Sequence, residues 1–147
     1  MGLVSFLRRH RRVALDTNVF IYAVEGHPKY ASLAYHVLEW VERSGHSAVT
    51  STVTMTELLT RPYSEKNGLW VNEYYGLLSR YPNLEWIAPN LETADLAARF
   101  RAQYRLRTPD AIQAATAVHA GVRGFISNDP AFRRVDGLET LLFDELL

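Results

Sequence analysis

The sequence predicts an α/β fold in which a parallel sheet lies between helices on both of its faces. Five short apolar runs have the length and residue types of strands, and longer helix-patterned segments separate most of them. The runs are Val13–Leu15, Ser47–Thr50, Leu84–Ile87, Gly124–Ser127 and Thr140–Phe143. Because neighbouring parallel strands need a crossover connection, this alternation is typical of a parallel sheet covered by helices.

Two segments between the strands carry apolar residues at helical spacing, so each can cover the sheet with an apolar stripe. The first stripe comprises Leu33, Ala34, Val37, Leu38 and Val41. The second comprises Ala111, Ala114, Ala115 and Val118. Because alanine is small, we expect the second helix to approach the sheet closely and to bring its first turn near the strand ends.

Helix boundaries can be placed from the residues that favour them. Thr108 is expected to cap the alanine-rich helix, with Pro109 at its first position and Gly121 at its end. The segment Arg61–Gly68 is rich in turn-forming residues and predicts the longest loop. No linker or repeat divides the chain, and a 48% hydrophobic content suffices for one core, so we expect a single domain over residues 1–147.

Composition and charge exclude several classes of site. The chain has no cysteine, and its five histidines show no clustered ligand spacing, so a metal would be held by oxygen atoms. A formal net charge of zero argues against a strong, nonspecific nucleic-acid binder. The apolar start, Leu3 to Leu7, is too short for a signal peptide and no apolar run could span a membrane, so we expect a cytoplasmic protein.

Four acidic residues follow strand-like runs: Asp16, Glu57, Asp110 and Asp129. In a parallel sheet we expect three of them to meet at the edge formed by the carboxyl ends of the strands, and Glu57 to come in from the helix that follows the second strand. Two carboxylates about 4 Å apart repel by roughly 4 kcal/mol at an effective dielectric of ~20, so a cluster needs a proton or a divalent cation. Oxygen-only ligands favour Mg²⁺ or Mn²⁺.

Each acid also has a purely structural interpretation. Asp16 and Asp129 can cap helices, and Asp110 can favour the positive end of a helix. Glu57 follows Thr54 at the spacing of a capping box. Both interpretations stand at this point, although four acids at one predicted edge favour the metal site.

Four motifs resemble the PIN domain family, and most closely its VapC-type ribonuclease toxins. They are LDTNVFIY, TMTELL, RTPDAIQAATA and FISNDPAFRRVDGLETL, in the order and at spacings similar to the family's, from about Val13 to Leu142. The resemblance implies a three-layer α/β/α fold and assigns the family's acids to Asp16, Glu57, Asp110 and Asp129. Ser127 stands where the family usually has threonine and keeps the hydroxyl.

What the resemblance implies is an endoribonuclease that uses Mg²⁺ or Mn²⁺, forms a homodimer and is inhibited by a cognate antitoxin protein. An RNA-processing nuclease without an antitoxin, or an inert PIN-fold module that binds RNA or protein, remains an alternative. A phosphoryl-transfer or receiver-type site is disfavoured, because neither Lys29 nor Lys66 lies near a late strand and Asn18 replaces the aspartate that the dehalogenase type needs.

In the proposed chemistry Asp16 and Asp110 anchor the metal, and Glu57 and Asp129 complete its shell. The neighbouring polar residues could orient the carboxylates or the attacking water, or could simply form turns; they are Thr17, Asn18, Ser127 and Asn128. Candidates for RNA contact are Arg61, Arg105 and Arg107.

Further basic and aromatic residues have two interpretations each. The run Arg8, Arg9, Arg11 and Arg12 either contacts phosphate or leads, solvated, into the first strand. Four aromatic residues could stack on bases but favour ordinary burial, and they are Tyr63, Trp70, Tyr74 and Tyr75. His119 is interpreted as structural.

Overall fold

A computed structural model describes residues 2–147 of the chain. Its elements, in order, are α1 (Leu3–Arg9), β1 (Arg12–Leu15), α2 (Thr17–Val24), α3 (Ala31–Glu42), β2 (Ser47–Ser51), α4 (Val53–Ser64), α5 (Gly68–Ser79), β3 (Leu84–Ile87), α6 (Leu91–Tyr104), α7 (Thr108–His119), β4 (Gly124–Ser127), η1 (Pro130–Arg134), β5 (Glu139–Leu142) and η2 (Phe143–Leu146). The five strands confirm the five predicted runs to within one residue at each end.

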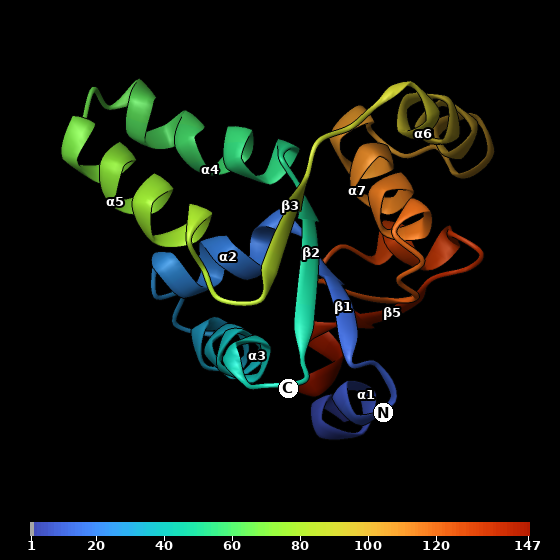
Figure 1. The fold of residues 1–147 in the computed structure, drawn as a ribbon, viewed down its shortest axis with the longest axis horizontal. Coiled ribbons are helices and arrows are strands. Elements are labelled where there is room, and N and C mark those ends of the chain that lie inside the picture. Colours follow the sequence, from blue (N-terminus) through green and yellow to red (C-terminus); the bar gives the residue numbers. More distant parts are fainter. Residues whose placement is uncertain (1) are drawn as a thin grey trace.

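The sheet is parallel throughout, in the order β3-β2-β1-β4-β5. β1 is therefore central, and the chain moves outward from it in both directions. Figure 1 shows the sheet on edge, with α6 and α7 on one side and α2 to α5 on the other. The three-layer α/β/α fold predicted from the sequence is confirmed.

Alternate residues of the central strands supply two cores. Val13, Leu15 and Ile126 point into the core under α1 to α4. Val49 and Phe125 point into the other core, against α6 and α7. All of these side chains are fully buried, as expected for central strands of a parallel sheet that is covered on both faces.

Helix α7 lies close to the sheet because its inner surface is built from alanine. Ala111, Ala114 and Ala115 are completely buried against Val49 and Phe125. The close approach predicted from the alanine stripe is confirmed, and it fixes the position of the first turn of α7, which carries Asp110.

Three local predictions were wrong. The segment Arg61–Gly68 is mostly not loop, because α4 continues through Pro62 to Ser64 and α5 begins at Gly68. Thr108 is the first residue of α7 rather than its cap, a position held by Arg107. Thr54 forms no capping box with Glu57, because α4 begins at Val53 and the side chains of both residues turn toward α2.

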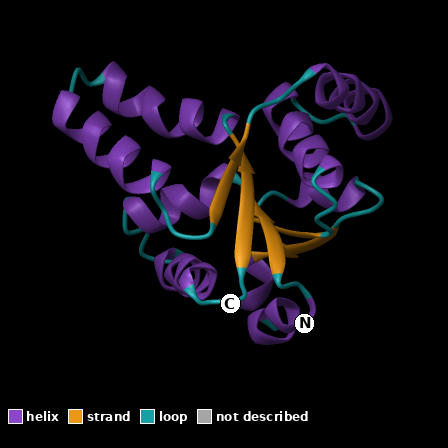
Figure 2. Ribbon diagram, viewed as in Figure 1, coloured by secondary structure: helices purple, strands orange, loops and turns teal. Residues whose placement is uncertain are grey.

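Helices α4 and α5 form a hairpin that extends beyond the sheet, as the ribbon in Figure 2 shows. It carries four large hydrophobic residues that are exposed: Tyr63, Leu69, Tyr75 and Leu77. Within residues 2–147, no helix is long and apolar enough to span a membrane.

Candidate active site

The four predicted acids lie around the carboxyl end of β1. This is the point where the strand order reverses direction, since β1 pairs with β2 on one side and with β4 on the other. Open α/β sheets bind ligands in the crevice at such a point. Asp16 follows β1, Asp129 follows β4 by two residues, and Glu57 and Asp110 come from α4 and α7.

Asp16 is the most buried of the four acids, with 6% of its surface exposed. Its Oδ1 accepts a hydrogen bond from the Thr17 amide at 2.8 Å and caps α2, and its Oδ2 accepts from the Ser127 hydroxyl at 2.7 Å. Burial, with smaller contributions from the charges of Asp110 and Glu57, raises the pKa of Asp16 to about 7 despite these two bonds. The helix-capping interpretation of Asp16 is therefore confirmed, and its role as a metal ligand stays a prediction.

Glu57 is exposed but is oriented by α2. The Thr17 hydroxyl donates to Glu57 Oε1 at 2.6 Å, across 40 residues of sequence. Because Thr17 is buried beside Asp16, this bond holds the Glu57 carboxylate toward the carboxyl end of β1.

Asp110 is buried in the first turn of α7, where the positive end of the helix favours a negative charge. Burial raises its pKa, the hydrogen bond and charge of Arg107 oppose that rise, and the charge of Asp129 adds to it. Arg107 Nε lies 3.1 Å from Asp110 Oδ2, and the arginine side chain is 76% exposed. Of the three RNA-contact candidates, Arg107 is thus the one that forms an ion pair with one of the four predicted acids within residues 2–147.

Asp129 is half-buried and accepts from the Ala131 amide at 2.9 Å, which caps η1. Its own amide donates to the Ser127 hydroxyl at 3.0 Å. Ser127 therefore connects Asp129 to Asp16, because Leu15 and Ile126 are paired in register and place the residues that follow them side by side.

A buried polar network beneath the acids was not identified from the sequence. Gln113 donates to Thr54 at 2.6 Å and to Thr17 at 3.3 Å, and its carbonyl accepts from the Ser51 amide at 3.3 Å. Thr54 bonds to Thr50, which donates to the Leu15 carbonyl at 2.9 Å. One polar residue three positions after Asp110, within an alanine stripe, was the available signal for Gln113.

The donor set suits a hard divalent cation. It consists of carboxylate oxygens, and burial raises the pKa of Asp16 and of Asp110, with the charges of neighbouring acids adding to the rise. Asn18 Oδ1 is buried without a hydrogen-bond partner. Within residues 2–147 it is the one buried side-chain nitrogen or oxygen atom that lacks a partner. In the part of the chain that the structure describes, no group of three or more acidic, histidine or cysteine side chains is arranged so that it could hold a metal ion.

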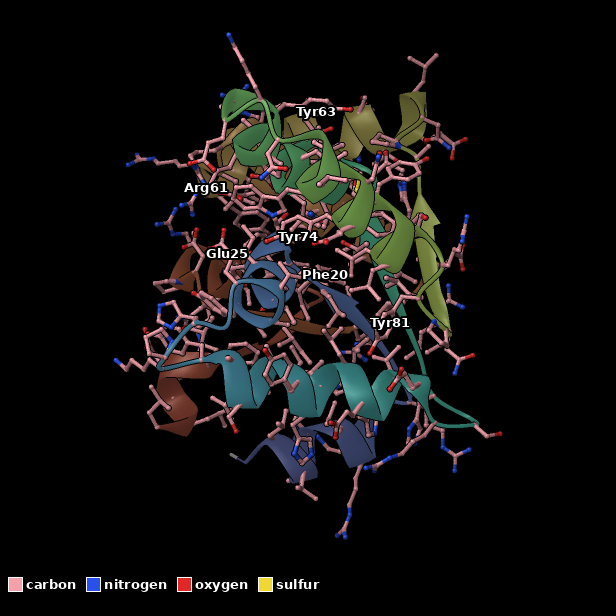
Figure 3. All side chains as sticks on the ribbon, turned by 90° about the vertical axis from the view of Figure 1, so that its left-hand side faces the viewer. Phe20, Glu25, Arg61, Tyr63, Tyr74 and Tyr81 are labelled. Atoms are coloured by element: carbon pink, nitrogen blue, oxygen red, sulfur yellow. The ribbon has the colours of Figure 1, made fainter. Side chains whose placement is uncertain are left out.

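The other predicted residues lie in varied positions. Asn18 donates to Ser127 over a long 3.5 Å, whereas Asn128 bonds to the Tyr22 hydroxyl and to the Asp144 amide. Arg61 pairs with Glu25 at 3.2 Å, and Figure 3 shows both on the side where α4 faces α2. Arg105 is exposed at the end of α6.

The remaining aromatic and histidine predictions concern residues outside the acidic cluster. Trp70 packs edge-on against Tyr74 at 5.7 Å and lies under the Arg61 guanidinium, whereas Tyr63 and Tyr75 are exposed. His119 Nδ1 lies 3.4 Å from the Thr93 hydroxyl at the far end of α7, in keeping with a structural role.

The fold and the cluster define a class: an α/β domain with acidic residues gathered at the switch point of a parallel sheet. The sequence model of the PIN domain matches residues 13–138, so the chain belongs to the PIN domain family. A search of curated proteins finds none with significant sequence similarity.

Solved structures share the fold. The chain aligns with VapBC-1 from nontypeable Haemophilus influenzae at 20% identity and a TM-score of 0.69, covering 90% of this chain and 98% of that one. It aligns with VapBC2 from Rickettsia felis, bound to promoter DNA, at 18% and 0.67, covering 89% and 98%. It aligns with a toxin–antitoxin complex from Klebsiella pneumoniae at 22% identity and a TM-score of 0.66, covering 87% of this chain and 96% of that one.

Proposed function

We propose that the protein is a metal-dependent endoribonuclease of the VapC type, acting as the toxin of a type II toxin–antitoxin pair. The observation that carries the proposal is the setting of Asp16, a buried carboxyl whose pKa rises to about 7 beside two further acids. Such a group suits a cation, because a bound cation stabilises the charged form of the carboxyl, which burial and the neighbouring acids disfavour.

Asp16 and Asp110 would anchor Mg²⁺ or Mn²⁺, with Glu57 and Asp129 beside them. A bound divalent cation would lower the pKa of a water molecule and offset charge on the phosphate oxygens. The chain itself orients the acids: Ser127 and Thr17 hold Asp16 and Glu57 through short hydrogen bonds. Arg107 would contact the RNA phosphate through the exposed part of its guanidinium.

A protein partner is supported by the α4–α5 hairpin. Four of the eight large hydrophobic residues that are exposed in residues 2–147 lie on it, beside a groove of about 510 Å³ formed by α4 residues around Tyr63. Exposed apolar surface of this kind marks protein interfaces. We assign it to a cognate antitoxin or to a second copy in a homodimer, and sedimentation of the isolated chain as a monomer only would contradict the homodimer.

The test is cleavage of a mixed RNA pool by purified, antitoxin-free protein in Mg²⁺, Mn²⁺ or EDTA. Asp16→Asn should remove metal-dependent cleavage. Asp95→Asn is the matched control, because Asp95 lies on the exposed side of α6 in an ion pair with Arg99 and should leave cleavage unchanged. Absence of cleavage by the folded protein across several RNAs would favour an inert binding module. Metal-dependent cleavage by a chain for which no inhibitory partner protein can be isolated would favour an RNA-processing enzyme.

A further inference from the structure

A groove lined by basic residues lies at the other end of the sheet, between α1 and α3. It has a volume of about 510 Å³, and its polar walls are formed by Arg8, Arg11, Arg43, His36 and His46. Figures 1 and 3 both show α1 beside α3, below the strands. Because β1 runs from Arg12 to Leu15, about 13 Å of strand separates this basic groove from the acids.

The structure divides the N-terminal arginine run into two kinds. Arg9 pairs with Glu139, and Arg12 pairs with Glu85 at 2.7 Å. Arg8 and Arg11 line the basic groove and form no ion pair with any residue in 2–147, and the same is true of Arg43. Three exposed guanidinium groups therefore face one hollow with their charge uncompensated.

Among the residues that the structure describes, no acidic side chain lines the basic groove. Helix α1 contains none, and the two on α3 are Glu39 and Glu42. Both lie near Tyr81, which precedes β3. Burial and the charges of these two glutamates raise the pKa of Tyr81 to about 12. Glu39 also borders a shallow hollow together with His36, which lines the basic groove as well.

The floor of the basic groove is aromatic. His46 stacks on Trp40 with ring centroids 4.2 Å apart and planes 12° apart. The Trp40 carbonyl lies 2.8 Å from His46 Nδ1, which fixes the orientation of the imidazole ring. A planar ring held rigidly among arginines can stack on a nucleobase while the guanidinium groups contact phosphates.

From these contacts we infer that the basic groove binds single-stranded RNA, with Arg8, Arg11 and Arg43 on consecutive backbone phosphates and the His46 ring near a base. The choice of RNA among polyanions rests on the proposed nuclease function, since a long substrate would then contact both ends of one sheet. Arginine suits the task because its planar fork matches the geometry of phosphate oxygens.

The test measures binding of a fluorescent 20-nucleotide single-stranded RNA by anisotropy in EDTA, where no metal-dependent cleavage occurs. The variant is Arg8→Glu, Arg11→Glu and Arg43→Glu together. Its matched control reverses three exposed charges elsewhere: Lys66→Glu, Arg80→Glu and Arg99→Glu. We expect the groove variant to bind at least tenfold more weakly. The slope of log affinity against log salt concentration should become shallower by about 2, as the loss of three phosphate contacts predicts for a single strand.

Equal affinity of the groove variant and the control would overturn the proposal, as would binding of a polyglutamate peptide in preference to RNA. Circular dichroism of both variants shows whether each is folded. If the triple variant does not fold, Arg43→Gln alone should still weaken RNA binding two- to fourfold, and unchanged binding would overturn the assignment. RNA binding that depends on these arginines in a protein that never cleaves RNA would refute the nuclease and leave the binding site intact.

Discussion

The two ends of the same sheet carry opposite charge, and the charged side chains are buried at one end and exposed at the other. At the carboxyl ends of the strands, Asp16 and Asp110 are buried and linked to hydroxyl groups or to Arg107. At the amino ends, Arg8, Arg11 and Arg43 are exposed and bind no acid within residues 2–147. Although the formal net charge of the chain is zero, a cluster of acidic side chains and a cluster of basic side chains are therefore separated by the length of the sheet.

The difference shows why the two ends suit different tasks. Buried carboxylates gain their properties from desolvation and from one another, so they are sensitive to a single proton or cation. Exposed guanidinium groups remain charged at every physiological pH and lose little by being solvated. The first arrangement favours chemistry on a bound group, and the second favours contact with an extended polyanion.

The largest effect is expected at the acidic end. Asp110→Asn should lower the rate of metal-dependent RNA cleavage by about 1000-fold, or roughly 4 kcal/mol of barrier, because it removes a charged oxygen from the cation site. Single-turnover cleavage measures it. In contrast, the triple variant of the basic groove should cleave a tetranucleotide within about threefold of the original rate. A similar loss in both variants would break the distinction between the two ends.

The network below the acids should be the next most sensitive feature. Gln113→Leu leaves the Ser51 amide and the Thr54 hydroxyl with one partner fewer in a buried setting, at a cost of about 1 to 3 kcal/mol in unfolding free energy. Urea denaturation measures the change. Gln113→Glu offers a matched shape, and stability equal to the original protein in both variants would deny the network a structural role.

The raised pKa of Asp16 predicts how stability depends on pH in the absence of metal. The folded protein holds this proton up to about pH 7, whereas the unfolded chain releases it near pH 4. Stability is therefore lost as pH rises between these values, and Asp16→Asn should not show that loss. At pH 8 in EDTA the variant should be more stable by about 2 kcal/mol. If the variant were less stable than the original protein at pH 8, the charge of Asp16 would not be what destabilises the folded protein there.

A substitution of Arg107 tests the role of the arginine that contacts Asp110 at the acidic end of the sheet. Arg107→Gln should reduce RNA cleavage about tenfold, near 1.4 kcal/mol, because an exposed phosphate contact is lost. It should also raise the pKa of Asp110 further, since Arg107 opposes that rise. The pH profile of cleavage should shift to higher pH. Arg105→Gln is the comparison, because that side chain is exposed but forms no ion pair with an acid in residues 2–147, so the pH profile should not shift.

The smallest effect is expected from the paired arginines at the basic end. Arg12→Gln removes an exposed ion pair with Glu85 and should change the unfolding free energy by less than about 0.5 kcal/mol. RNA affinity should change less than in Arg11→Gln, its neighbour in the basic groove. Equal loss of affinity in the two variants would mean that the whole run, and not the groove, supplies the contact.

Local sequence patterns were sufficient for the architecture. Short apolar runs, the alanine stripe of α7 and the positions of Asp16 and Asp129 after strands all follow from residue type and periodicity. They failed where local preference competes with packing. Pro62 lies inside α4 rather than ending it, because buried Thr54, Leu58 and Pro62 hold that helix against its neighbours.

The sequence by itself determined the strands, the parallel sheet and the four acids that its edge collects, because these depend on local chain geometry and on which strands a helix can connect. Only the tertiary structure decided which polar groups meet. It joined Gln113 to Thr17 and Thr54 across 96 and 59 residues. It also paired Arg9 and Arg12 while leaving Arg8 and Arg11 beside Arg43. Such contacts depend on distances between elements, and no local pattern encodes those distances.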